Sequence, residues 1–177
     1  MADPAARRPA VLLTPVANRA YLRLRTHLTQ QASDSEDPRI GGQALPSRVG
    51  RTLAGAIRAQ CLGPGDWLLR SQAFSVAEIR TQLEGGLRAP GAVLVDTSDA
   101  LLSLDVSGTA AREFLSKACG LDLHPRSFPV GRCARSRFAQ IPVVIECLDE
   151  SPRFELIVAR SYFEYLRSWC EDSAAEF

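Results

Sequence analysis

The stretch Arg132–Val158, RCARSRFAQIPVVIECLDESPRFELIV, contains three consecutive predicted β-strands and decides the fold class. Residues 132–138 and 141–148 are predicted to form the first two strands, the second of them rich in the β-branched residues typical of sheets. Residues 149–152, Asp-Glu-Ser-Pro, have the composition of a hairpin turn, and residues 154–158 form the returning strand. Strands joined by so short a turn pair antiparallel, so the stretch predicts an antiparallel sheet.

Further strands are predicted on the N-terminal side of this stretch, at residues 21–26, 67–70, 92–96 and 101–106. In residues 21–26, YLRLRT, apolar and charged residues alternate, which is typical of a half-buried strand. The Gly-Pro-Gly-Asp sequence at residues 63–66 predicts a turn that leads into the strand at 67–70.

Three helices are predicted between and after these strands. Ser75 and Glu78 have the spacing of a capping box, which predicts a helix that begins at this point. A second helix is predicted between Gly108 and Gly120, and Ser161 is the predicted N-cap of a final helix. The apolar face of the final helix comprises Phe163, Leu166 and Cys170.

This order of elements predicts an α+β fold of two successive β-α-β type units, with a largely antiparallel sheet that carries helices on one side. Residues 21–177 are expected to form a single domain. Residues 1–20, rich in Ala, Pro and Arg, are expected to form a mobile arm, and the polar residues 30–46 a long loop.

Composition excludes several classes of function. The 177 residues are 46% hydrophobic and carry a net charge of +1, so no overall field favours nucleic acid or acidic membranes. No segment has the apolar length of a signal peptide or a membrane span, and we expect a cytoplasmic protein. The cysteines are odd in number and widely spaced, which predicts buried free thiols: Cys61, Cys119, Cys133, Cys147 and Cys170.

Four blocks, in order, resemble the sarcosine oxidase gamma subunit family. The two most specific are Gly120–Ile145, GLDLHPRSFPVGRCARSRFAQIPVVI, and Pro152–Trp169, PRFELIVARSYFEYLRSW. The other two are Leu62–Leu69, LGPGDWLL, and Asp96–Gly108, DTSDALLSLDVSG. The region in which these blocks lie, from Cys61 to Trp169, is about two thirds of the chain, and four ordered blocks are far more specific than a single short motif.

The resemblance carries expectations about fold, activity and partners. It implies a fold similar to the folate-binding domain of the glycine-cleavage aminomethyltransferase. It implies a subunit of an enzyme that oxidises sarcosine to glycine, with hydrogen peroxide and formaldehyde or methylene-tetrahydrofolate. The family's complex has four subunits, and the gamma subunit is expected to contact alpha, with beta and delta in the same assembly. FAD, FMN, NAD, tetrahydrofolate and zinc are expected in the other subunits, and none in this chain.

The residues themselves offer no clear catalytic site. The chain lacks the glycine-rich loop that cradles dinucleotide phosphates. A metal site or catalytic triad would need His27 or His124, and His124 is more simply a residue that hydrogen-bonds within the 120s loop. Three carboxylates could serve acid–base chemistry: Asp96, Asp99 and Asp105. Asp96 and Asp99 flank a turn, however, and are expected to bond the backbone locally.

Two groups of residues are candidates for a partner interface. The arginines of the first predicted strand are Arg132, Arg135 and Arg137, of which the last two share a face at period two. They form either a solvated sheet edge or a set of salt bridges to a partner subunit. The aromatic residues of the final helix are Tyr162, Tyr165 and Trp169, which either contact a partner or are deeply buried.

Two other functions remain open. One is the same role in a sister complex that oxidises another N-methylated amine, because the substrate pocket is expected in another chain. The other is a free-standing folate-binding protein, against which the short chain counts.

Overall fold

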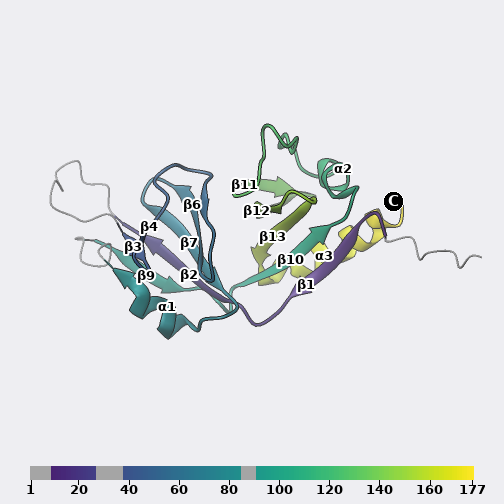
Figure 1. Cartoon of the computed structure of the whole chain (residues 1–177). Helices are drawn as coiled ribbons and strands as arrows, with labels where there is room; N and C mark the ends of the chain where they lie inside the picture. Colours follow the sequence, from purple (N-terminus) through teal and green to yellow (C-terminus); the bar gives the residue numbers. More distant parts are fainter. Residues whose placement is uncertain (1–8, 27–37, 85–90) are drawn as a thin grey trace, which may run out of the picture. The chain divides into compact units, whose positions relative to one another are not determined.

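The computed structural model describes residues 9–26, 38–84 and 91–177, which group into two compact units (Figure 1). The N-terminal unit holds Ala17–Leu102 together with Gly131–Ala134. The C-terminal unit holds the residues up to Val16, Ser103–Val130 and Arg135–Phe177. The expected single domain, residues 21–177, thus contains residues of both units.

The N-terminal unit is built on a five-stranded sheet of order β5-β6-β7-β2-β9. Neighbouring strands in this sheet pair antiparallel. The strands are β2 (Ala20–Arg25), β5 (Thr52–Leu53), β6 (Arg58–Gly63), β7 (Asp66–Ser71) and β9 (Val93–Asp96). A small sheet of order β4-β3-β8 adds β3 (Arg39–Ile40), β4 (Gln43–Ala44) and β8 (Leu83–Glu84).

Helix α1 (Val76–Gln82) covers one face of the five-stranded sheet of the N-terminal unit, as Figure 1 shows. Its fully buried Ile79 joins a core that includes Leu22, Leu24 and Leu69. The predicted capping box is confirmed, because the Ser75 side chain accepts from the Glu78 backbone and the Glu78 carboxylate accepts from Ser75 N.

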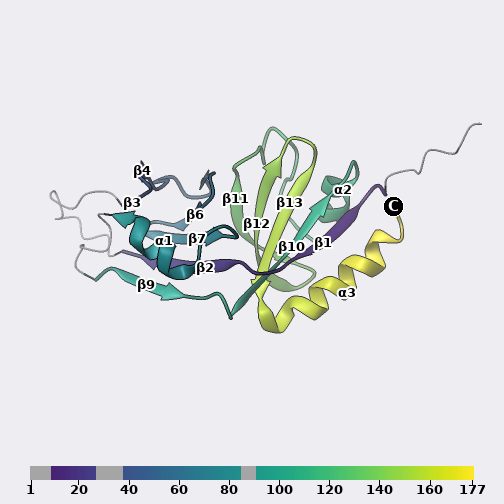
Figure 2. The ribbon, with the colours of Figure 1, turned by 60° about the horizontal axis from the view of Figure 1, so that its bottom comes forward.

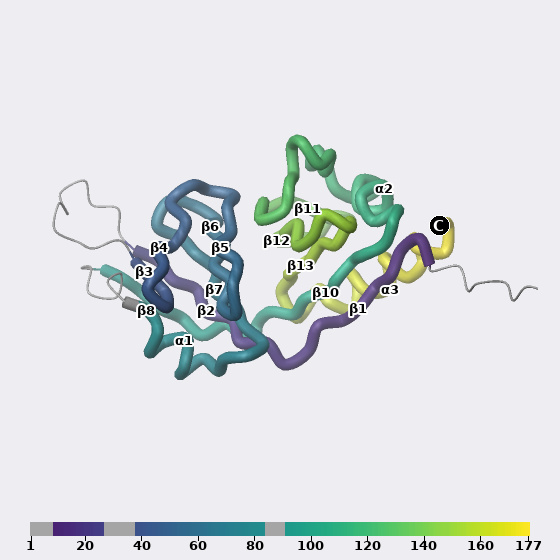
Figure 3. Tube along the Cα trace, in the orientation of Figure 1, coloured from purple at the N-terminus to yellow at the C-terminus, as the bar shows by residue number. Residues whose placement is uncertain are grey.

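The C-terminal unit is built on a second five-stranded sheet, of order β1-β10-β13-β12-β11. Its strands are β1 (Leu12–Val16), β10 (Leu101–Ser107), β11 (Cys133–Phe138), β12 (Ile141–Asp149) and β13 (Arg153–Ala159). Figure 3 shows the purple β1 beside the teal β10, with which it pairs antiparallel although the two strands lie far apart in the sequence. The predicted hairpin of β12 and β13 is confirmed.

Helices α2 (Ala111–Ser116) and α3 (Phe163–Ala174) belong to the same unit (Figure 2). Their buried residues include Phe114 of α2 and Leu166 and Cys170 of α3. The predicted N-cap at Ser161 is wrong, because a 3-10 turn, η1 (Arg160–Tyr162), precedes α3 and no side chain caps the helix.

The structure confirms the α+β class with largely antiparallel pairing and corrects the expected arm. Residues 12–16 of the predicted arm form β1, because their backbone groups pair with β10 from Leu12 to Val16. Residues 1–8 lie outside the described residues. All five cysteines are buried and free, as predicted. Over the described part of the chain, no helix combines the length and apolarity needed to cross a bilayer.

Candidate partner-docking surface

The turn between β11 and β12 has an unusual backbone conformation. Ala139 and Gln140 are the only two residues between these strands, and their φ angles are 45° and 73°. A two-residue hairpin turn with both central φ angles positive is normally occupied by Asn and Gly. Side chains with a Cβ are strained in this region, so the neighbours of the turn must hold it in place.

Two of the predicted interface residues hold this turn. The Tyr165 hydroxyl of α3 donates to the Ala139 carbonyl at 2.9 Å, and the Arg137 guanidinium donates to the Gln140 carbonyl at 2.9 Å. Ala139 N also donates to the Ala118 carbonyl at 3.1 Å. The structure therefore brings Arg137 of the arginine strand and Tyr165 of the aromatic helix to one turn.

Exposed aromatic and basic side chains lie on the two elements that contact the turn, β11 and the η1–α3 segment. Tyr162 is 41% exposed and Tyr165 is 48% exposed. Arg135 and Arg137 are both exposed on β11, which agrees with the predicted sharing of a face. Tyr and Arg are enriched in the centres of protein interfaces. We call the surface formed by Arg135, Arg137, Tyr162 and Tyr165 the turn surface.

Trp169 has a different environment from the two tyrosines. Its ring centroid lies 5.0 Å from that of Phe138, in an edge-on arrangement, and 6.1 Å from that of Phe114. The ring is half-buried between these two side chains, so Trp169 contributes to the packing of its own unit. A role for it at an interface stays a prediction.

Arg132 is separate from the other two arginines. It precedes β11 and belongs to the N-terminal unit, where it forms an isolated antiparallel bridge with Arg51. Its guanidinium lies so close to Gly50 that an added Cβ there would be 3.0 Å from it. The turn surface therefore does not include Arg132.

The candidate catalytic residues have local structural roles. His124 Nδ1 accepts from Arg126 N at 3.2 Å, which confirms the expected hydrogen bond within the 120s loop. Asp96 accepts from the hydroxyl and the amide of Ser98, and these bonds lower the pKa of its carboxyl. Asp105 forms a salt bridge with Arg153. His27 lies outside the described residues.

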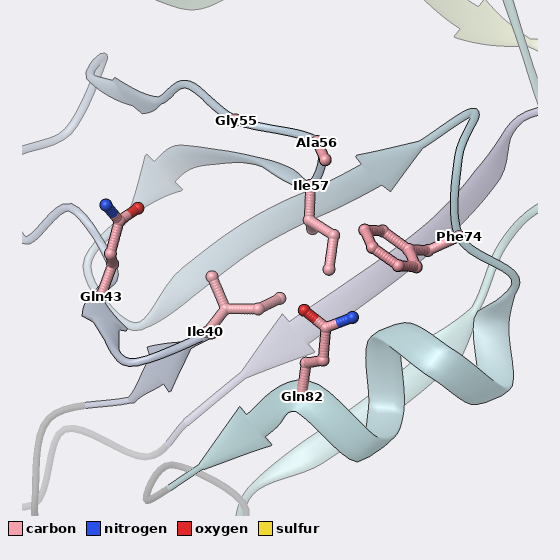
Figure 4. A pocket seen from close by; sticks show the side chains of 8 residues that line it. Ile40, Gln43, Gly55, Ala56, Ile57, Phe74 and Gln82 are labelled. Atoms are coloured by element: carbon pink, nitrogen blue, oxygen red, sulfur yellow. The ribbon is translucent and has the colours of Figure 1, made fainter.

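A further feature of the described residues with the shape of a binding site is a small pocket in the N-terminal unit (Figure 4). Its volume is about 140 Å³, and its lining is apolar or neutral: Ile40, Gly41, Gln43, Gly55, Ala56, Ile57, Phe74 and Gln82. Pockets for cofactors usually measure about 300–1,000 Å³, so this one is too small for a flavin or a folate. In residues 9–26, 38–84 and 91–177, no group of His, Cys, Asp and Glu has an arrangement that fits a metal ion.

The chain shares the fold class of a solved aminomethyltransferase T of the glycine cleavage system from Bartonella henselae. The TM-score is 0.65 over 92% of this chain and 46% of that one, and 12% of residues are identical, so this likeness concerns the fold alone.

Within this class, the family described as "Sarcosine oxidase, gamma subunit family" matches residues 33–176. The chain belongs to this family. The gamma subunit from Corynebacterium sp. strain U-96 is 35% identical over 140 residues, and the one from an Arthrobacter species is 33% identical over 142. The matched region covers 77% of this chain and 66% of each of these relatives.

A solved heterotetrameric sarcosine oxidase from Corynebacterium sp. U-96, in complex with pyrrole 2-carboxylate, contains a chain of the same fold. Its TM-score is 0.81, with 29% identity, over 97% of this chain and 87% of that chain. The likeness includes both compact units, since it extends over nearly the whole of this chain.

Proposed function

We propose that this chain is the noncatalytic gamma subunit of a heterotetrameric sarcosine oxidase. The observation that carries the proposal is the match with a chain of a heterotetrameric sarcosine oxidase over 97% of this chain. The proposed complex oxidises the N-methyl group of sarcosine to give glycine, with hydrogen peroxide and formaldehyde or methylene-tetrahydrofolate as the other products.

The role of this chain in the complex is to dock on the alpha subunit, with beta and delta in the same cytoplasmic assembly. The turn surface supports docking, because it combines two exposed tyrosines with two exposed arginines, and Tyr165 and Arg137 are fixed by hydrogen bonds to the Ala139–Gln140 turn. Tyrosine and arginine side chains placed on a rigid support lose little conformational freedom on binding.

Catalysis and cofactors are assigned to the other subunits: FAD, FMN, NAD, tetrahydrofolate and zinc. The small, neutral pocket described in the N-terminal unit does not itself offer the volume or the charges that a dinucleotide needs. The similar fold of the aminomethyltransferase does not transfer its activity to this chain, since function depends on the site rather than on the fold.

The test is co-expression of this chain with the alpha, beta and delta subunits of its complex. We expect the four chains to co-purify with flavin and to form hydrogen peroxide when sarcosine is added. The purified chain alone is expected to be colourless and inactive. Assays with dimethylglycine and N-methylglutamate separate sarcosine oxidase from a sister complex with another substrate.

Two results would count against the proposal. One is failure of this chain to co-purify with the other three. The other is tight tetrahydrofolate binding by the chain alone, with a Kd in the micromolar range or below, which would favour a free-standing folate-binding protein.

A further inference from the structure

Strand β9 forms an exposed apolar edge of the N-terminal sheet. It follows β2 at the end of the strand order, and Figure 2 shows it at the margin of the sheet. Val93 is 52% exposed and Val95 is 47% exposed, and both point to one face because alternate residues of a strand share a face. Leu94 points to the other face and packs against the core. Among the described residues, no strand pairs with the outer edge of β9.

The register shows which backbone groups of β9 point outward. Thr97 N donates to the Tyr21 carbonyl, so Tyr21 and Thr97 form a hydrogen-bonded pair. Bonded and non-bonded pairs alternate in an antiparallel ladder, so Val95 and Val93 bond to β2 through Arg23 and Arg25.

The N–H and C=O groups of Leu94 and Asp96 therefore point away from β2. A second bond supports this alternation of bonded and non-bonded pairs, because Thr26 N donates to the Gly65 carbonyl on the β7 side of β2. That bond assigns the even-numbered residues of β2 to β7 and leaves its odd-numbered residues to β9.

Within the described residues, β9 has neither lysine, proline nor a β-bulge to prevent pairing with another chain, and its protection is limited to its short length and Asp96. Edge strands are commonly protected by lysine, proline, a β-bulge or a covering element. Val93–Asp96 contains no lysine, arginine or proline, and its pairing with β2 has no register shift. Its single charge, on Asp96, is at the end of the strand and accepts hydrogen bonds from Ser98.

The size of this edge indicates what kind of partner can occupy it. Four residues of strand span about 13 Å, and an added strand of that length would bury on the order of a few hundred Å². A stable independent complex usually buries at least about 1,000 Å². The edge is therefore too small to hold a second copy of this chain by itself. It suits a segment of a protein that is already bound elsewhere, for which the effective concentration is high.

We propose that an extended segment of the alpha subunit adds to the outer edge of β9 and bonds to the backbone of Leu94 and Asp96. This inference rests on the proposed function, since it requires the assembled complex. Apolar residues of the segment pack beside Val93 and Val95. Arg25 lies opposite Val93 in the register, and its side chain is 64% exposed. Arg25 already lies 3.7 Å from the Asp66 carboxylate, so a carboxylate of the segment near that end would add a second, exposed partner to this charge.

Hydrogen exchange resolved at single amides tests the proposal, with the isolated chain compared with the assembled complex. In the complex, we expect the amides of Leu94 and Asp96 to exchange at least about tenfold more slowly, because they gain a partner strand. The amides of Val93 and Val95 serve as internal controls, because they already bond to β2 and should change much less.

A pair of variants provides a second readout. Replacement of Val93→Lys together with Val95→Lys should weaken binding of the chain to alpha by about tenfold and abolish the slowing at Leu94. Val49→Lys is the matched control, since Val49 is 45% exposed in the same unit but does not lie on β9. Circular dichroism of each variant alone should be unchanged.

The outcomes distinguish this inference from the proposed function. If no complex forms, both are wrong. If the complex forms but Leu94 and Asp96 exchange as in the isolated chain, only the strand addition is wrong. Slow exchange of both amides in the isolated chain, whether or not it depends on concentration, would also overturn the proposal, because this chain itself would then occupy the edge.

Discussion

Gly108 shows how one residue fixes the connection between β10 and α2. Its φ is 114°, and a Cβ at this position would lie 2.4 Å from the Ala10 carbonyl oxygen. Its amide donates to the Pro152 carbonyl, and Ala110 N donates to the same Ala10 carbonyl. The chain thus passes too close to Gly108 for any other side chain.

We predict that Gly108→Ala destabilises the protein by about 2–4 kcal/mol, because it adds a backbone clash to a left-handed φ. Denaturant unfolding measures the change. Gly120→Ala is the matched control, since no atom lies within 4 Å of a Cβ at that glycine, and it should be close to neutral. Equal stabilities for the two variants would contradict the argument.

At the Ala139–Gln140 turn, by contrast, we predict that a substitution raises the stability of the protein. Replacement of Ala139→Asn together with Gln140→Gly places the residues preferred at positive φ in this turn. We expect the free energy of unfolding to rise by about 0.5–1.5 kcal/mol, because the strain in the folded state is relieved. A decrease in stability would mean that the present side chains make contacts that outweigh the strain.

Cys170 makes stability depend on pH in the alkaline range. Burial, and to a lesser extent Glu171, raises the pKa of this thiol from 9.0 to about 12. The folded state therefore keeps the proton between pH 9 and about 12, whereas the unfolded state loses it. The contribution of the Cys170 thiol to the free energy of unfolding is fully present below pH 9. It declines by about 1.4 kcal/mol per pH unit as the pH rises from 9 towards 12.

The corresponding experiment compares the protein with Cys170→Ala between pH 9 and 10.5. The variant should be less stable at pH 8, because a small cavity replaces the buried sulfur. Its stability should nevertheless fall less steeply with pH than that of the original chain. Parallel curves for the two proteins would show that the thiol does not titrate as described.

At the scale of elements, local signals were predicted well and distant pairings were not. Ser75 and Glu78 identified the start of α1, because both partners of a capping box lie within four residues. Ser161 was misleading, because the 3-10 turn at Arg160–Tyr162 intervenes before α3. The break between β11 and β12 at residues 139–140 was predicted, but its positive φ angles were not, since Ala and Gln do not favour them and neighbours hold the conformation.

Distant pairings escaped prediction for a physical reason. Strand β1 exists because β10 supplies its hydrogen-bond partners, and nothing within residues 12–16 specifies that pairing. The neighbouring strands β9 and β10 were predicted individually, but they enter different sheets. Of the candidate site, the sequence indicated the arginines and tyrosines of the turn surface, but not that Arg137 and Tyr165 meet at one turn.

The turn surface gives a prediction about association between subunits. We expect Arg135→Glu with Arg137→Glu to slow binding to alpha by about tenfold at low salt, with a smaller effect at high salt, because exposed charges act mainly through screened long-range attraction. Surface plasmon resonance with immobilised alpha measures the rate. Arg48→Glu with Arg51→Glu changes the net charge equally on exposed residues of the other unit and should have less effect. Equal slowing would indicate a general charge effect.

At the scale of the whole molecule, we expect the chain to contribute contact surfaces to a larger assembly. The similarity to a heterotetrameric sarcosine oxidase extends over both compact units, so both are expected to be part of the assembly. The turn surface belongs to the C-terminal unit and the β9 edge to the N-terminal unit. Two separate contact surfaces are consistent with a subunit whose function is assembly.

The most direct test of this central claim is the mass of the complex measured by native mass spectrometry, after co-expression with the alpha, beta and delta subunits. We expect a single assembly with one copy of each chain, active on sarcosine. That mass should be lost when this chain is omitted, or when the Arg135→Glu and Arg137→Glu variant replaces it at low concentration. A complete, active enzyme that contains only the other three chains, with this chain purifying separately, would contradict it.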